Sequence, residues 1–292
     1  MTSTNVRSLF VASLILTPAA FATATVFGSA QSEAACSKVL FALTVVVEVI
    51  ALVQALAVRS SFSRNDHARL TWSLIVAFLV VRLAGELRLA TLTFEVVSTY
   101  KEGAPVYLFV YVVALRYLYT LGDVLFVAAL ITTVRAYRST GLRFELMARD
   151  YGYMALLWAM PVITYLFRRN LSLGGIITSD DHVMTYRLVA VFIGAVIASL
   201  CVAVRRYAVQ MGGGAVARVW NTVVVAGIAR DASFLVLAVL LKRWRSGAQF
   251  AEQYLLWAFA GCWLLAALYQ REVLQRIAPS NVAMRTATQD VS

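Results

Sequence analysis

Charged side chains are scarce in this sequence of 292 residues. Asp, Glu, Lys and Arg together make up 14% of the residues, whereas charged residues usually make up about 25% of a soluble domain. Hydrophobic residues account for 61%, and the mean hydropathy of the whole chain is +0.77. This composition is too apolar for a soluble domain, and it predicts an integral membrane protein.

Cysteine, histidine and lysine are also rare, and each shortage excludes a kind of site. The three cysteines show no C-x-x-C or other metal-ligand spacing, so neither a zinc site nor a structural disulfide is expected. The two histidines fall in polar connections, which excludes the paired intramembrane ligands of a haem. The only late lysine, Lys242, lies at the end of an apolar run, whereas a retinal Schiff base needs a lysine deep inside a late helix.

Catalytic motifs are missing as well. The sequence contains neither H-E-x-x-H nor G-x-S-x-G, the patterns that would place a metal site or an activated serine. We therefore predict that the chain is not an enzyme and that it holds no metal or cofactor. The net charge of +11 comes without a basic stripe interleaved with aromatic residues, so nucleic acid is not expected as a partner.

Long apolar runs fill most of the chain. Because about 20 residues cross a bilayer as a helix, and continuous runs lack the alternation of a β-barrel strand, we predict an all-α polytopic transmembrane helix bundle. The bundle has eight spans, or seven if the first run is a cleaved signal peptide. That run has about 22 residues against the usual ~7–15 of a signal peptide, which favours a retained span. The runs are Leu9–Ala30, Val39–Val58, Leu70–Phe94, Val106–Val134, Tyr151–Phe167, Leu188–Val204, Ala217–Leu241 and Tyr254–Tyr269.

Short connections leave no room for an attached soluble domain of ~100 residues. Residues 1–277 are predicted to form one bundle, followed by a polar, flexible tail at 278–292. A parallel internal repeat of about 9–134 and 151–269 is a further hypothesis. In each half a span ends in Val-Arg, and the next span carries a Trp with an Arg ten residues later: Trp72 and Arg82, then Trp220 and Arg230.

Basic residues outside the spans predict the orientation. With a cytoplasmic N-terminus, fourteen Lys and Arg fall on the inner side and eight on the outer side, as the positive-inside rule requires. The C-terminus is then cytoplasmic too, in an inner or plasma membrane of bacterial type. The lipid bilayer is the expected partner, with anionic head groups near Arg135, Arg138 and Arg143.

Ionisable side chains inside the spans are the most informative feature. Each costs roughly 2.5–3.5 kcal/mol near the bilayer centre on insertion scales, so they are rarely retained without a role. Eight occur here, and their formal charges cancel, as expected of side chains that pair with one another. They are Arg82, Arg88, Arg116 and Arg230, with Glu48, Glu86, Asp123 and Asp231.

Helix geometry limits how these charges pair. Arg82 and Glu86 are four residues apart and therefore share a face at ion-pair distance. Arg116 and Asp123 also share a face, but about 10 Å of helix axis separates them, so each needs a partner on another helix. An arrangement with Arg230 or Arg116 opposite Glu48 or Glu86 is compatible with the sequence.

The sequence is compatible with two functions. In the first, a small polar or anionic solute moves through the bundle as in a transporter or channel, along Glu48, Arg82, Glu86, Arg116, Asp123, Arg230 and Asp231. In the second, the same charges only fix helix packing, and the chain is a non-enzymatic membrane subunit, scaffold or sensory module that acts through a partner protein or a second copy of itself.

Overall fold

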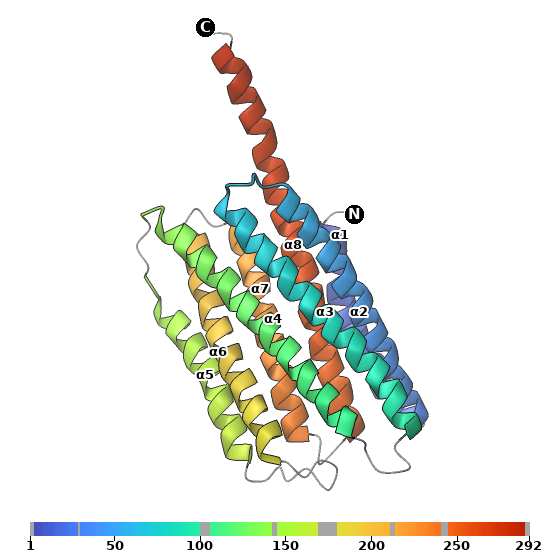
Figure 1. The fold of residues 1–292 in the computed structure, drawn as a ribbon. Coiled ribbons are helices and arrows are strands. Elements are labelled where there is room, and N and C mark those ends of the chain that lie inside the picture. The colour runs from blue at the N-terminus through green and yellow to red at the C-terminus, as the bar shows by residue number, and fades with distance from the viewer. Residues whose placement is uncertain are drawn as a thin grey trace.

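A computed structural model gives the fold (Figure 1). It describes residues 3–28, 30–99, 106–141, 145–168, 180–210, 214–240 and 245–289. The side chains of residues 88–117 and 277–289 lie outside the described part, as do those near the end of the fifth and seventh helices and the start of the sixth and eighth. The helices are α1 (Ser3–Phe27), α2 (Ala30–Ser60), α3 (His67–Thr99), α4 (Val106–Arg138), α5 (Ala148–Arg168), α6 (Asp180–Gln210), α7 (Gly214–Leu240) and α8 (Arg245–Gln289).

Each predicted span corresponds to one helix, so the prediction of an all-α bundle is confirmed. Six helices contain a stretch that is long and apolar enough to cross a bilayer, judged on the described residues: α1, α2, α3, α4, α6 and α8. α8 has 45 residues and continues past Ile277 to Gln289, so most of the predicted tail is helical. Figure 1 shows this end of α8 running well past the rest of the bundle.

The helices run alternately up and down, which brings both termini to the same end of the bundle (Figure 1). Six helices form the centre: α3 packs on α4 and α7 on α8, while α4 contacts α6 and α8 contacts α2. Two helices lie outside, with α1 against α2 and α8, and α5 against α6 and α7. Residues on α2, α3, α4 and α7 can therefore meet in the middle.

Aromatic and small side chains fill the centre. Phe78 of α3 and Phe126 of α4 are stacked with ring centroids 5.0 Å apart, and Trp263 of α8 packs edge-on against Phe126 at 5.1 Å. Alanines such as Ala51 and Ala198 are fully buried and let neighbouring helices approach closely. The interior next to the charged groups described below is thus packed by side chains.

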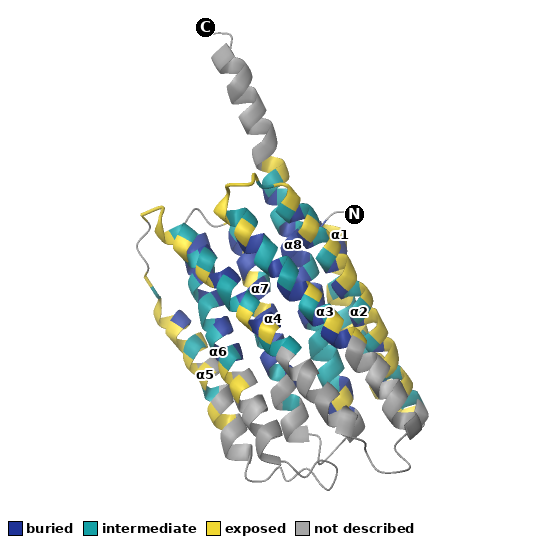
Figure 2. Ribbon diagram, viewed as in Figure 1, coloured by how far each residue is buried: buried dark blue, intermediate teal, exposed yellow. Residues whose placement is uncertain are grey.

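Large apolar side chains also cover the outside. Leu9, Ile15 and Val26 of α1 and Val39 and Val53 of α2 are each more than half exposed, and Figure 2 shows the exposed positions along the outer helices. An apolar outer surface of this kind is unstable in water and suits the acyl chains of a bilayer. The helices therefore face lipid, and the charged residues face one another.

Candidate functional site

Six of the eight intramembrane charges lie near the middle of their helices and are buried. Each is at least nine residues, or about 14 Å of helix axis, from either end of its helix. None is more than 5% exposed. They are Glu48 of α2, Arg82 and Glu86 of α3, Asp123 of α4, and Arg230 and Asp231 of α7.

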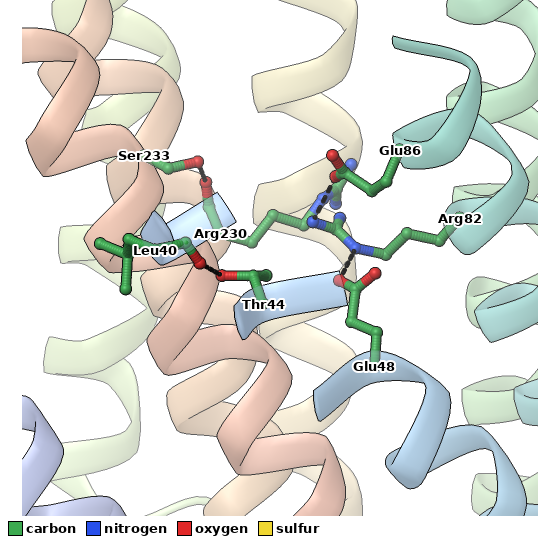
Figure 3. Close-up of polar contacts among 7 residues, drawn as sticks. All are labelled: Leu40, Thr44, Glu48, Arg82, Glu86, Arg230 and Ser233. Carbon is green, nitrogen blue, oxygen red and sulfur yellow. Dashed lines mark hydrogen bonds and ion pairs between the residues drawn. The ribbon is translucent and has the colours of Figure 1, made fainter. Parts of the chain in front are cut away.

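Arg82 is the centre of the first cluster (Figure 3). Its Nε donates to Glu48 Oε1 at 3.0 Å, and one terminal nitrogen donates to Glu86 Oε1 at 3.2 Å. The guanidinium lies over the ring of Phe259 of α8, 4.0 Å from the centroid, which is a cation–π contact. A side-chain hydrogen bond joins Tyr119 of α4 to Glu86. Arg82 thus links α2, α3 and α8, and Glu86 adds a contact with α4.

Arg230 is the centre of the second cluster. Its terminal nitrogen donates to Asp123 Oδ2 at 2.5 Å, which joins α7 to α4. Asp231 is the next residue, and its carboxylate packs against Gly194 of α6, where even a Cβ atom would collide with it. Figure 3 shows the Arg230 side chain extending toward the group formed by Arg82 and Glu86. Both clusters lie near the middle of their helices.

The structure decides the pairings that the sequence left open. The predicted ion pair between Arg82 and Glu86 is confirmed. Glu48 pairs with Arg82 rather than with Arg230, and Asp123 finds its partner on α7. The side chains of Arg88 and Arg116 lie outside the described residues.

Negative charge exceeds positive charge in the described part of this centre. Four carboxylates, those of Glu48, Glu86, Asp123 and Asp231, accompany two guanidiniums. Two of the carboxylate oxygens, Glu48 Oε2 and Asp231 Oδ1, are buried without a hydrogen-bond partner among the described residues. The six described charges are therefore not a set of closed pairs, although the eight found in the sequence are formally neutral.

The nearby hydroxyl groups do not supply the missing donors. A hydroxyl has a single proton to donate, and Thr44, one turn before Glu48, donates it to Leu40 O at 2.8 Å. Ser233, close to Asp231 in sequence, donates to Arg230 O at 2.6 Å. Both bonds are drawn in Figure 3. Each hydroxyl is thus used within its own helix.

A fifth buried carboxylate, Asp150, was not singled out from the sequence. Its Oδ2 accepts from the backbone N–H of Met147 at 2.9 Å at the start of α5. Arg205 and Arg206 of α6 lie 3.6 and 3.7 Å from its two oxygens. In the sequence, the adjacent Arg205 and Arg206 at the end of a predicted span indicate that an acidic partner is needed. Only the packing of α5 on α6 shows that this partner is Asp150.

Tyr119, Phe259 and Gly194 were also missed by sequence reasoning. Tyr119 lies four residues before Asp123 and hence on the same face of α4, which was a usable signal. It packs against Gly85 of α3, where a Cβ atom would meet its ring at 3.1 Å. Phe259 and Gly194 carry no sequence signal, because they act only by facing a charge on another helix.

The basic residues expected near lipid head groups lie at a helix end. Arg135 and Arg138 fall in the last turn of α4, and Arg143 lies outside the described residues. Binding of anionic lipid by these residues stays a prediction. As for metals, no three His, Cys, Asp or Glu side chains come together in the described part of the chain.

The fold and this buried centre define a multi-pass α-helical membrane protein with a charged interior. In a comparison with known proteins, no family model, no curated protein and no solved structure matches the chain.

Proposed function

We propose that this chain is a transporter or channel-like protein that moves a small polar solute across the membrane through the centre of the bundle. The observation that carries this proposal is the incomplete pairing of the buried charges. Charges that only hold helices together are expected to be neutral as a set and fully hydrogen-bonded, because each unpaired buried charge destabilises the fold. A centre with two spare carboxylate oxygens departs from that expectation.

The sign of the imbalance also bears on the solute. Sequence considerations allowed a polar or an anionic solute, held by the arginines. In the described centre, both guanidiniums already bind carboxylates, and carboxylates are in excess. An added anion would meet like charge in a medium of low dielectric constant. Among the described residues, this arrangement favours a neutral polar or a cationic solute over an anionic one.

The test is counterflow of labelled solutes in proteoliposomes containing the purified full-length chain. A suitable panel consists of amino acids, polyols, primary amines and short carboxylates. We expect exchange of at least one neutral or cationic member, reduced about tenfold in Asp123→Asn and Asp231→Asn. Asp150→Asn is the matched control, since it removes a buried carboxylate outside the centre, and its exchange should equal that of the unmodified chain.

A second function, that of a membrane subunit or sensory module, is supported by the length of α8. About 20 residues are enough to cross a bilayer, and α8 has 45, so the helix can offer a surface to a partner protein beyond the bundle. Purification in a mild detergent separates the two proposals. A stoichiometric partner together with no exchange of any panel member would favour the subunit and contradict transport.

A further inference from the structure

The guanidinium of Arg82 lies between residues of two other helices. Glu48 of α2 accepts a hydrogen bond from its Nε at 3.0 Å, and the ring centroid of Phe259 of α8 lies 4.0 Å from its Cζ. Figure 3 shows Glu48 and Arg82 facing each other from separate helices. All three residues are buried. We call Glu48 and Phe259 together the cation site.

A carboxylate beside an aromatic face is well suited to an organic cation. The negative face of the ring attracts a guanidinium or an ammonium group, and it does so more strongly where water is excluded. A carboxylate adds opposite charge and can accept two parallel hydrogen bonds from a guanidinium. In the cation site Arg82 uses only Oε1 of Glu48, and Oε2 is buried without a hydrogen-bond partner among the described residues. The site thus holds a guanidinium and has an acceptor for a further hydrogen bond.

Arg82 has a second carboxylate partner on its own helix. One of its terminal nitrogens donates to Glu86 Oε1 at 3.2 Å, and the two residues are four positions apart on α3. Such a pair forms within one helix and needs no other. When Arg82 leaves Glu48 and Phe259, it therefore keeps a partner in Glu86.

A cation that enters the site has to replace Arg82, because the site is filled. Glu48, Arg82 and Phe259 are at most 5% exposed. The guanidinium is already in van der Waals contact with the ring, so no further group fits between them. Replacement gives Glu48 one cationic partner before and after the exchange, and a buried carboxylate is not left alone. This holds whatever charges lie elsewhere in the bundle.

Asp150 shows that a buried carboxylate with an arginine does not by itself make such a site. Arg205 and Arg206 lie 3.6 and 3.7 Å from its oxygens, and its Oδ2 also accepts from the backbone N–H of Met147. Two arginines from one helix thus hold this carboxylate at the start of α5. It serves below as a control.

We propose that Glu48 and Phe259 form the solute site of the bundle, that Arg82 occupies this site when no solute is bound, and that the solute is an organic cation with a guanidinium or primary ammonium group. The solute displaces the guanidinium of Arg82 toward Glu86, which releases α3 from α2 and α8. The movement of this cation across the membrane rests on the proposed function, whereas its binding does not.

Binding of methylguanidinium to the full-length protein in nanodiscs tests the site, and isothermal titration calorimetry measures it. Methylurea is the matched probe, because it has nearly the same shape but no charge. We expect the unmodified chain to bind methylguanidinium and not methylurea. Arg82→Ala should bind methylguanidinium at least about tenfold more tightly, because a tethered group no longer competes for the site.

Competition has a second signature in Phe259→Leu. In an Arg82→Ala chain, loss of the ring should weaken the binding of methylguanidinium about tenfold, as expected of a cation–π contact shielded from water. In a chain that keeps Arg82, the loss should be less than about threefold, because the ring attracts Arg82 and the ligand alike. Equal losses in both chains would show that the ligand binds beside Arg82, and would overturn the proposal.

Arg82→Lys keeps a positive charge, so it decides the question if Arg82→Ala does not fold. An ammonium cannot make the paired hydrogen bonds of a guanidinium and is a weaker competitor, so the affinity should rise about threefold. Asp150→Asn and Arg59→Ala remove charges outside the site and should leave the affinity unchanged. Three results would overturn the proposal: no binding to the unmodified chain, equal binding of methylurea, or an unchanged affinity in Arg82→Lys.

The outcome is distinguishable from that of the transport test. Binding that follows Arg82 and Phe259 as described, found together with no exchange of methylguanidinium or of any panel member, would support the cation site and contradict transport. Exchange of a neutral solute without any binding of methylguanidinium would support transport and contradict the cation site.

Discussion

Replacement of Arg82 by methionine is the sharpest test of how the charged centre holds the bundle together. The change removes two ion pairs and the contact with the ring of Phe259, and it leaves Glu48 and Glu86 buried without their counter-charge. Removing one partner of a buried ion pair costs about 3–5 kcal/mol. By contrast, an ordinary interhelical hydrogen bond in a membrane contributes only about 0.6 kcal/mol.

The free energy of unfolding distinguishes these magnitudes. It can be measured by titrating the purified protein in mixed micelles with sodium dodecyl sulfate and following helicity by circular dichroism. We expect Arg82→Met to lose about 3–5 kcal/mol. Adding Glu48→Gln and Glu86→Gln in the same chain should recover about half of the loss, because the neutral amides no longer need a counter-charge.

Arg59→Met is the matched control. Arg59 lies at the end of α2 and is only half-buried, and its described bond is to Ser73. We expect its removal to cost less than about 1 kcal/mol. Two results would refute a stabilising role for the charged centre. One is a loss of unfolding free energy in Arg82→Met that is no larger than the loss in Arg59→Met, and the other is a larger loss when the two glutamines are added.

Two further predictions concern close packing. Gly194→Ala places a methyl group where the carboxylate of Asp231 now lies, and should lower the free energy of unfolding by about 1–3 kcal/mol. The same substitution in an Asp231→Ala chain should cost much less, and equal costs in both chains would show that the two residues do not interact. Phe78→Ala empties the centre of the aromatic cluster with Phe126 and Trp263 and should cost about 3–5 kcal/mol in the same titration, whereas a loss below 1 kcal/mol would contradict the burial described here.

The helices could be predicted from the sequence because a bilayer imposes one clear requirement on the backbone. Every backbone polar group in the apolar layer must bond within its own segment, so an apolar run of about 20 residues predicts a helix with little ambiguity. Boundaries were less predictable. The end of α8 illustrates this, since polarity after Ile277 suggested a loose tail and the helix continues to Gln289.

The identity of the buried charges could also be predicted, whereas their partners could not. Arg82 and Glu86 share one helix, and a spacing of four residues is enough to pair them. Glu48 and Asp123 lie on separate helices, and nothing in a linear pattern tells which neighbour each one faces. The contribution of Gly194 was invisible for a related reason, because a glycine matters only through what packs against it.

Composition and hydropathy alone establish that this is a membrane-embedded helical protein with ionisable groups inside its apolar segments. The reason is that insertion of each segment into lipid depends on the hydropathy of its own residues. Only the packing of the helices establishes that Arg82 pairs with Glu48 and Glu86 and that Arg230 pairs with Asp123. It also establishes that one oxygen each of Glu48 and Asp231 has no hydrogen-bond partner among the described residues. Distances between helices depend on how all of them fit together, and no single segment carries that information.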